Sequence, residues 1–290
     1  MRPLAALNAR DTPLAIATIC VGVAFLVAND AIAKLLTDRY APIQIVFLRN
    51  LIAVPIIAAV ILAAFGSGHL RTQHLGLHAL RGAVMMTGAW LYFTALIYLP
   101  LAEATALVFS APIFITALSV PLLGEQVGWR RWGAVLFGFA GVLVIVRPGS
   151  AAFQLAALLP VGTAMCYALF MLSARWIDRS ERLWTMMLFA MLFPMIYAAP
   201  CAVMNWTPVQ AGDILLFVGL AICGSLGLAL IGQAFRMAPA AIVAPFDYTA
   251  LIWATGLGWL IWGDVPMRWT ILGAAIIVGS GIIIILRDAR

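Results

Sequence analysis

Residues 101–125 read LAEATALVFSAPIFITALSVPLLGE, and the charged residues of this stretch are Glu103 near its start and Glu125 at its end. The run between them is mostly apolar and about as long as the roughly 20 residues that an α-helix needs to cross a bilayer. The stretch therefore predicts a membrane-spanning helix over residues 101–122. Pro112 lies within it and frees a backbone carbonyl, so we expect the helix to bend there.

The whole chain shares this apolar character. Of its 290 residues, 65% are hydrophobic and 10% are charged, against roughly 25% charged in an ordinary soluble domain. A soluble fold of this length could not cover so much apolar surface. The length suits about ten spans of about 20 residues each. The composition therefore predicts an all-α integral membrane protein with no separate soluble domain.

Glycines, prolines and clustered charges divide the chain into ten predicted transmembrane helices. These cover residues 13–36, 42–65, 76–98, 101–122, 131–147, 154–175, 183–204, 213–236, 240–262 and 269–287. Connections as short as Leu99-Pro100 and Ala238-Pro239 require neighbouring helices to form antiparallel hairpins. The first helix carries Asn29, Asp30 and Lys34, so it is predicted to be permanent rather than a cleaved signal peptide.

The arginines predict the orientation in the membrane, and they account for most of the formal charge of +6. If the N-terminus is cytoplasmic, that side carries Arg2, Arg10, Arg71, Arg81, Arg130, Arg131, Arg175, Arg179, Arg182, Arg236, Arg287 and Arg290. The opposite side then carries Arg39, Arg147 and Arg268. Positive residues favour the cytoplasmic side, so both termini are predicted there. Cations placed singly or in pairs beside apolar spans indicate membrane orientation, not binding to nucleic acid.

The two halves of the chain resemble each other. A shift of 139 residues aligns Pro100, Gly124 and Glu125 with Pro239, Gly263 and Asp264. An odd number of helices in each half places the second copy upside down. We therefore predict two inverted five-helix repeats, residues 1–147 and 148–290, with a substrate site near the membrane midplane between them.

Four stretches resemble the EamA type of the drug/metabolite transporter superfamily, and the likeness covers essentially the whole chain. They are Asn29-Asp30-Ala31-Ile32-Ala33-Lys34, Phe47-Leu48-Arg49, the run from Leu101 to Glu125, and Trp132-Gly133-Ala134 with Gly141-Val142. The resemblance implies alternating access, a bacterial inner-membrane location, and export or exchange of metabolites, often amino acids. Aromatic residues within the spans are similar to those of the aromatic amino-acid exporter branch. A multidrug or nucleobase-type efflux transporter of the same fold is the alternative.

Ionisable residues inside spans are costly, so they are candidate transport residues. Asp30 and Lys34 lie one turn apart, where they either neutralise each other or meet the substrate. Arg49 is predicted to pair with Asp30, with Glu103 or with the C-terminal end of a helix. Glu103 either complements a helix dipole in a first turn or acts in gating.

Asp247 is the principal candidate. It lies about one-third of the way into the ninth predicted helix, beside the helix-breaking Pro245, and it has no charged counterpart in the first half. Its neighbour Tyr248 aligns with Phe109, so an aromatic residue occurs at the same depth in both halves. The alternative is a purely structural bond from Asp247 to a neighbouring threonine or to Arg236.

Polar and aromatic residues within the spans complete the candidate substrate site, because aromatic walls suit an apolar or aromatic solute. They are Ser110 and Phe114, on the same face as Glu103, together with Trp90, Tyr92, Tyr167, Gln233, Tyr248 and Trp253. The expected partners are a small-molecule substrate, the lipid bilayer and, as a candidate coupling ion, the proton. The oligomeric state and the direction of flux stay open.

Several other functions lack a sequence basis. No catalytic motif is found, so an enzyme is the less favoured class and no cofactor is expected. The four cysteines show no paired spacing that would predict a disulfide frame or a zinc site. His69, His74 and His78 lie near the longest connection with no acid close to them in sequence, which favours a solvated basic loop over a metal site.

Overall fold

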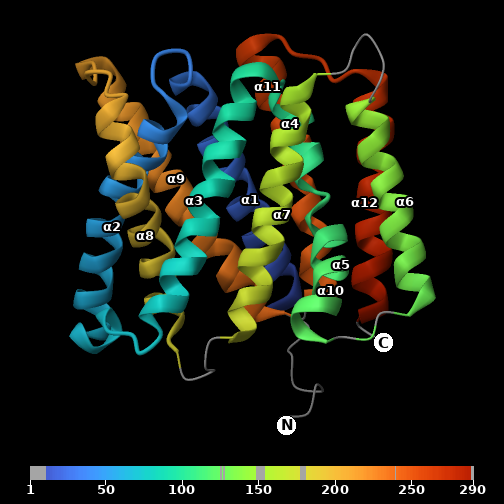
Figure 1. Cartoon of the computed structure of the whole chain (residues 1–290), viewed down its shortest axis with the longest axis horizontal. Helices are drawn as coiled ribbons and strands as arrows, with labels where there is room; N and C mark the ends of the chain where they lie inside the picture. Colours follow the sequence, from blue (N-terminus) through green and yellow to red (C-terminus); the bar gives the residue numbers. More distant parts are fainter. Residues whose placement is uncertain are drawn as a thin grey trace.

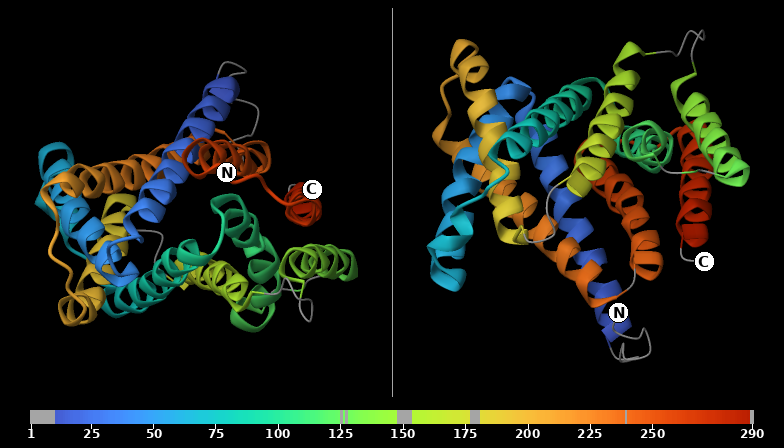
Figure 2. Two further views of the ribbon diagram at one scale, coloured as in Figure 1. Left: turned by 90° about the horizontal axis from the view of Figure 1, so that it is seen from above. Right: turned by 60° about the horizontal axis from the view of Figure 1, so that its bottom comes forward.

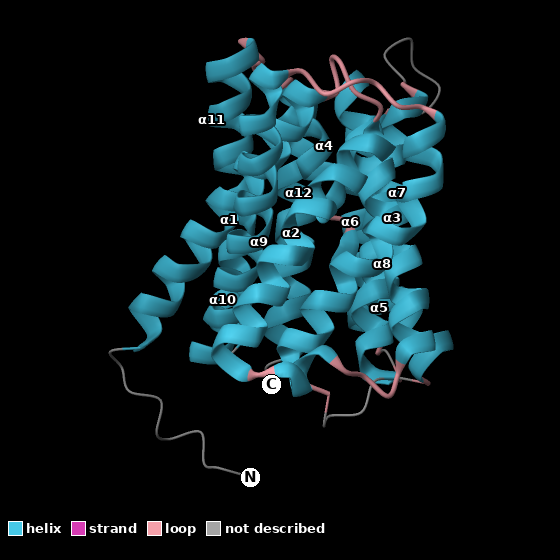
Figure 3. Ribbon diagram, turned by 90° about the vertical axis from the view of Figure 1, so that its left-hand side faces the viewer, coloured by secondary structure: helices cyan, strands magenta, loops and turns pink. Residues whose placement is uncertain are grey.

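The computed structural model describes residues 11–124, 126, 128–147, 154–176, 181–238 and 240–288. These residues form helices joined by short connections, with no strand among them (Figures 1 and 3). The helices of the first half are α1 (Asp11–Leu36), α2 (Pro42–Phe65), α3 (Leu75–Tyr98), α4 (Leu101–Val108), α5 (Ala111–Leu123) and α6 (Trp129–Val146). Those of the second half are α7 (Leu158–Ser173), α8 (Leu183–Met204), α9 (Ile214–Met237), α10 (Ala240–Val243), η6 (Ala244–Thr249), α11 (Ala250–Trp262) and α12 (Arg268–Asp288).

Each of the ten predicted ranges contains helix, and successive segments run in alternating directions in Figure 1. Within the described residues, seven helical segments are long and apolar enough to cross a membrane. They are 13–36, 42–64, 75–98, 101–123, 155–173, 184–204 and 211–237. The all-helical membrane class is therefore confirmed. Ten crossings arranged as two inverted halves remain a prediction.

The fourth and ninth predicted helices are interrupted, and a proline lies at each interruption. Pro112 is the second residue of α5, where its missing N–H and its ring prevent α4 from continuing through Phe109 and Ser110. Pro245 is the second residue of η6, a 3₁₀ segment between α10 and α11. The bends expected at Pro112 and Pro245 therefore take the form of breaks in the helix.

Two walls of helices face each other across the bundle, as the left view of Figure 2 shows. The first wall contains α1, α9 and α11, and the second contains α3, α5 and α7. The helices α2 and α8 close one end of the bundle, whereas α6 and α12 stand at the other. The most extensive helix contacts are α1–α9, α6–α12, α2–α8 and α3–α7.

Glycines explain the close approach of two of these pairs. A Cβ atom on Gly227 of α9 would lie 2.9 Å from the carbonyl oxygen of Gly22 on α1. A Cβ atom on Gly273 of α12 would lie 2.6 Å from the carbonyl oxygen of Gly141 on α6. Small residues let helix backbones approach in a membrane, where packing rather than the hydrophobic effect drives association. Any side chain at these positions would push the helices apart.

Polar contacts tie the α1–α2 connection to the α8–α9 connection at the upper end in Figure 1, and we call them the upper clasp. Asp213 forms a salt bridge with Arg39 at 3.0 Å and accepts a hydrogen bond from the Tyr40 hydroxyl at 2.7 Å. Gln44 and Thr207 exchange two hydrogen bonds, of 2.7 and 3.0 Å. The clasp joins segments that are about 170 residues apart, so it fixes the two hairpins relative to each other.

Candidate functional site

Asp30 of α1 lies between the two walls and is half-buried. The Asn29 amide donates a hydrogen bond to its Oδ1 at 3.0 Å. The hydroxyl of Tyr92, a buried residue of α3, lies 3.2 Å from its Oδ2 and donates to it when the carboxyl group is ionised. The side chains of Asp30 and Tyr92 thus join the first wall to the second.

The contacts of Asp30 extend to α2 and α4. The hydroxyl of Thr105 on α4 lies 3.3 Å from that of Tyr92 and donates to the carbonyl oxygen of Leu101 at 2.8 Å. Arg49 of α2 attracts Asp30 electrostatically, although the two form no direct ion pair within 4.0 Å. Its guanidinium lies 5.7 Å from the centre of the Phe93 ring. We call Asn29, Asp30, Arg49, Tyr92 and Thr105 the Asp30 cluster.

Lys34 does not pair with Asp30, although the two lie one turn apart on α1. Its Nζ donates to the carbonyl oxygen of Leu99, at the C-terminal end of α3, at 2.6 Å. It also lies 5.2 Å from the centre of the Trp262 ring of α11. The structure therefore does not show Asp30 and Lys34 neutralising each other. Lys34 instead bridges the walls closer to the upper end.

Asp247 of η6 is half-buried and forms no hydrogen bond or ion pair with the described residues. The structural partners considered for it are engaged elsewhere. The Thr249 hydroxyl donates to the carbonyl oxygen of Phe246 at 2.7 Å, and Arg236 is exposed. Tyr167 of α7, on the second wall, lies within the electrostatic influence of Asp247 and is 45% exposed. Asp247 and Tyr167 therefore lie close enough to influence each other, and both keep accessible surface.

An aromatic pair lies where the two interrupted segments meet. Phe109, in the break between α4 and α5, and Tyr248, in η6, have ring centres 4.9 Å apart and an interplanar angle of 55°. The Tyr248 hydroxyl is buried against Gly281 of α12 and has no hydrogen-bond partner among the described residues. The two residues aligned by the sequence repeat are therefore in direct contact.

Three other predicted site residues lie along α4 and α5. Ser110 is fully buried, and its hydroxyl donates to the carbonyl oxygen of Leu107 at 2.7 Å, so it satisfies the backbone at the helix break. Phe114 is half-buried one turn further on. Glu103 lies in the first turn of α4, as a residue that complements the helix dipole would, and it is attracted by Arg147.

Trp90, Gln233 and Trp253 do not join these groups. Trp90 is 43% exposed and lies two residues, hence about 200°, around α3 from Tyr92. Gln233 is exposed and shares its face of α9 with the exposed Leu226. Trp253 is 44% exposed, on the same face of α11 as Leu260, which is 73% exposed. No hydrogen bond or ring contact joins any of the three to the central acids among the described residues, so their place in the site stays a prediction.

The expectation that all three histidines belong to a solvated loop is wrong for His78. Its side chain is buried, its Nε2 lies 3.8 Å from Glu181 Oε1, and its ring stacks on Phe189 with centres 5.0 Å apart. The acid comes from the segment before α8, which packs on α3 although it is distant in sequence. Among the described residues no group of three or more potential ligands could hold a metal ion.

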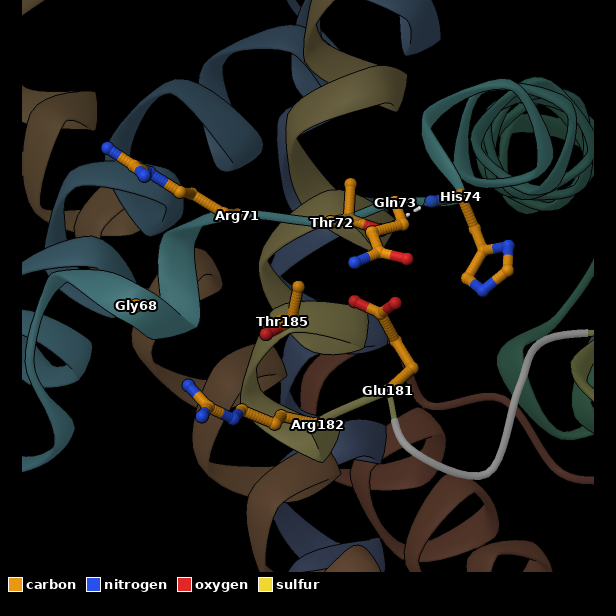
Figure 4. Close-up of a pocket in the computed structure, with 8 residues that line it drawn as sticks. All are labelled: Gly68, Arg71, Thr72, Gln73, His74, Glu181, Arg182 and Thr185. Atoms are coloured by element: carbon orange, nitrogen blue, oxygen red, sulfur yellow. Dashed lines mark hydrogen bonds between the residues drawn. The ribbon is translucent and has the colours of Figure 1, made fainter.

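A polar pocket of about 250 Å³ lies at the lower end of the bundle, between the α2–α3 connection and the start of α8. Figure 4 shows the Glu181 carboxylate directed toward Gln73, with Arg71 and Arg182 to one side and His74 to the other. The pocket does not include Asp30 or Asp247. It is therefore separate from the central polar groups.

Two residues of the central site were not identified from the sequence. Asn29 directly precedes Asp30 and holds its Oδ1, and Thr105 lies two residues after Glu103. Neither is charged, so the cost of burying charge gave no signal. Thr105 would have been found by asking which hydroxyls on the fourth helix face a tyrosine of the third.

Comparisons with known proteins agree with this architecture. Residues 13–147 match the EamA-like transporter family. A "Riboflavin transporter" of Vibrio cholerae is 32% identical over 271 residues, which cover 90% of this chain and 89% of that protein. An "S-adenosylmethionine uptake transporter" of Rickettsia bellii is 28% identical over 264 residues, which cover 91% of this chain and 90% of that protein.

A solved crystal structure has the same fold, with a TM-score of 0.64 and 21% identity, over 94% of this chain and 99% of that one. The likeness to the aromatic amino-acid exporter branch is not supported, since the relatives are named for riboflavin and S-adenosylmethionine. An amino-acid substrate consequently has no support among them.

Proposed function

The chain belongs to the EamA-like transporter family, and we propose that it moves a heteroaromatic metabolite of the riboflavin class across the bacterial inner membrane. The observation that carries this proposal is the Asp247 carboxylate, which has no hydrogen-bond or ion-pair partner among the described residues, exerts an electrostatic influence on Tyr167 and neighbours Tyr248 of the aromatic pair. A carboxylate left without a partner inside a membrane protein marks a candidate substrate pathway. Membership of a transporter family favours transport over an enzymatic role.

The chemistry of a flavin fits this arrangement. An isoalloxazine ring is flat, and aromatic side chains offer it a stacking surface worth about 0.5–1.5 kcal/mol per ring pair beyond area burial. An imide N–H or a ribityl hydroxyl would donate to Asp247, and the Asp30 cluster would serve the polar end. Hydrogen bonds to a charged acceptor contribute about 1.5–3 kcal/mol each. The site thus combines aromatic surface with hydrogen-bond acceptors at two depths.

S-adenosylmethionine is the second candidate, and a specific observation favours it. Neither Asp30 nor Asp247 has a cationic side chain within 4.0 Å among the described residues. Two carboxylates without direct counter-ions would suit a sulfonium and an ammonium group. Binding of S-adenosylmethionine would depend on the charge of Asp247, whereas binding of a neutral flavin would depend mainly on the hydrogen-bond acceptors of Asp247.

The transport mechanism we propose is alternating access between two inverted halves, residues 1–147 and 148–290. The helix contacts support this division, because exchanging the halves maps α1–α9 onto α7–α3 and maps α2–α8 and α6–α12 onto themselves. Inverted repeats of this kind place the substrate near the midplane and exchange their conformations during the cycle. The arginine distribution supports cytoplasmic termini.

Uptake into liposomes tests the substrate. Purified protein should accelerate the movement of riboflavin into liposomes, followed by its fluorescence, relative to protein-free liposomes. S-adenosylmethionine, supplied with a radioactive label, forms the second arm. If folded protein moves neither compound nor other heteroaromatic metabolites in a broad panel, the proposal is wrong.

A further inference from the structure

Three contacts in the Asp30 cluster form one line of oxygen atoms from α1 to α4. Asp30 Oδ2 lies 3.2 Å from the Tyr92 hydroxyl, and this hydroxyl lies 3.3 Å from Thr105 Oγ1. Thr105 Oγ1 lies 2.8 Å from the carbonyl oxygen of Leu101. Tyr92 and Thr105 are both buried, so water has little access to the contact between their hydroxyls, whereas Asp30 at the end of the line is half-buried.

A count of hydrogens decides the protonation state that satisfies this line. Each tyrosine or threonine hydroxyl supplies one hydrogen, and a carbonyl oxygen supplies none. The two hydroxyls therefore fill two of the three contacts when Asp30 is ionised. A proton on Asp30 Oδ2 supplies the third hydrogen, and the bonds then run in one direction, from Asp30 to Tyr92 to Thr105 to Leu101. The Asn29 amide occupies Oδ1 and leaves Oδ2 for the proton.

The charged surroundings oppose this protonated state with a single cation. Arg49 of α2 is the charged group that acts on Asp30. Besides Cys20 and Lys34 on α1 itself, the elements packed on α1 carry these titratable residues: Cys223 and Arg236 of α9, Asp247 and Tyr248 of η6, Glu103 of α4, and His78, Arg81, Tyr92 and Tyr98 of α3; α10 and α11 have none. Of these residues, Tyr92 is the one that contacts Asp30 directly, through its hydroxyl. Asp30 thus keeps the Tyr92 contact in both states: it completes the hydroxyl line when protonated, and it is attracted by Arg49 when ionised.

We propose that Asp30 is a proton-binding site, at which a proton taken from water completes the hydroxyl line and its release leaves a carboxylate that draws in Arg49. Only the O–H bond of the carboxyl group forms or breaks in this step. Asp30 and Tyr92 belong to opposite walls. The hydrogen bond between them is donated by Asp30 in the protonated state and by Tyr92 in the ionised state, so the link between the walls differs between the two states. The use of this proton to drive substrate movement rests on the proposed transport function, whereas the proton binding itself does not.

Infrared difference spectroscopy of the purified protein between low and high pH tests the proposal without any substrate. Wild type should show the carbonyl stretch of a protonated carboxyl group that disappears as the pH rises. Asp30→Asn should remove this signal, and Asp247→Asn should leave it in place. If Asp30→Asn leaves the signal unchanged, Asp30 does not bind the proton and the proposal is overturned.

Thr105→Val supplies a second test that is close to isosteric. Without the Thr105 hydroxyl, Tyr92 can donate to an ionised Asp30 with no competing contact. The midpoint of the carboxyl signal should therefore shift to lower pH by about one unit, roughly the value of one hydrogen bond. Thr105→Ser keeps the hydroxyl and should keep the wild-type midpoint. Equal midpoints for Thr105→Val and wild type would also overturn the proposal.

Discussion

Asp30 and Asp247 are two half-buried acids in the same bundle, and their surroundings are opposite. Asp30 has hydrogen-bond partners on two helices and a cation nearby, whereas Asp247 has no partner among the described residues. The Tyr92 hydroxyl contacts Asp30 directly, whereas Tyr167 lies within the electrostatic influence of Asp247 without a hydrogen bond to it. An acid with internal hydrogen-bond partners can gain or lose a proton without a ligand. An acid without such partners depends on a bound ligand to supply one.

The largest expected effect comes from Asp247→Asn. This change keeps the shape of the side chain but removes the charge and one acceptor. Because nothing else in the described structure compensates, riboflavin transport in liposomes should fall at least about ten-fold, equivalent to about 1.4 kcal/mol. Asp38→Asn, at an exposed acid on the α1–α2 connection, is the matched control and should behave as wild type. Unimpaired transport by Asp247→Asn would break the distinction between the two acids.

A smaller effect is expected from Tyr92→Phe, measured as stability. The change removes a buried hydroxyl that contacts both Asp30 and Thr105, and the loss should cost about 1–2 kcal/mol of the free energy of unfolding. The Tm in detergent should fall by about 2–4 °C or more. Tyr167→Phe is the control on the other side of the comparison, since the Tyr167 hydroxyl is not held by an internal hydrogen bond. Equal Tm losses in both variants would contradict the idea that Asp30 alone has a built partner.

The smallest effect is expected from Tyr248→Phe. The Tyr248 hydroxyl is buried without a described partner, so its removal relieves the cost of an unsatisfied polar group and keeps the ring on Phe109. The Tm should stay the same or rise slightly, and the free energy of unfolding should stay within about 1 kcal/mol of wild type. Tyr248→Ala, which also removes the ring, is the comparison and should lower the Tm. A clear loss of stability in Tyr248→Phe would show that the hydroxyl has a partner after all.

The sequence predicted the helices well because lipid imposes a length and an apolarity that can be counted along the chain. It also made Asp30 and Asp247 candidates, because charge inside a span is costly wherever it lies; their role in transport stays a prediction. It could not tell that Tyr92, rather than Trp90, contacts Asp30, since the face of α3 that packs on α1 depends on the tertiary fold. His78 failed for the same reason, because Glu181 reaches it only after α8 packs on α3.

The upper clasp has a mechanical consequence. Arg39 and Tyr40 hold Asp213, while Gln44 holds Thr207, so the α1–α2 and α8–α9 hairpins are bound as one lever although they come from different halves. Two hairpins tied together at one end move as a unit, so bending is expected where other helices are interrupted. These interruptions are at Phe109–Ser110, between α4 and α5, and at η6, between α10 and α11, where the α-helix is not continuous. The two breaks meet at the Phe109–Tyr248 contact, which lies outside the clasped hairpins, so we expect a change in helix geometry to be taken up there.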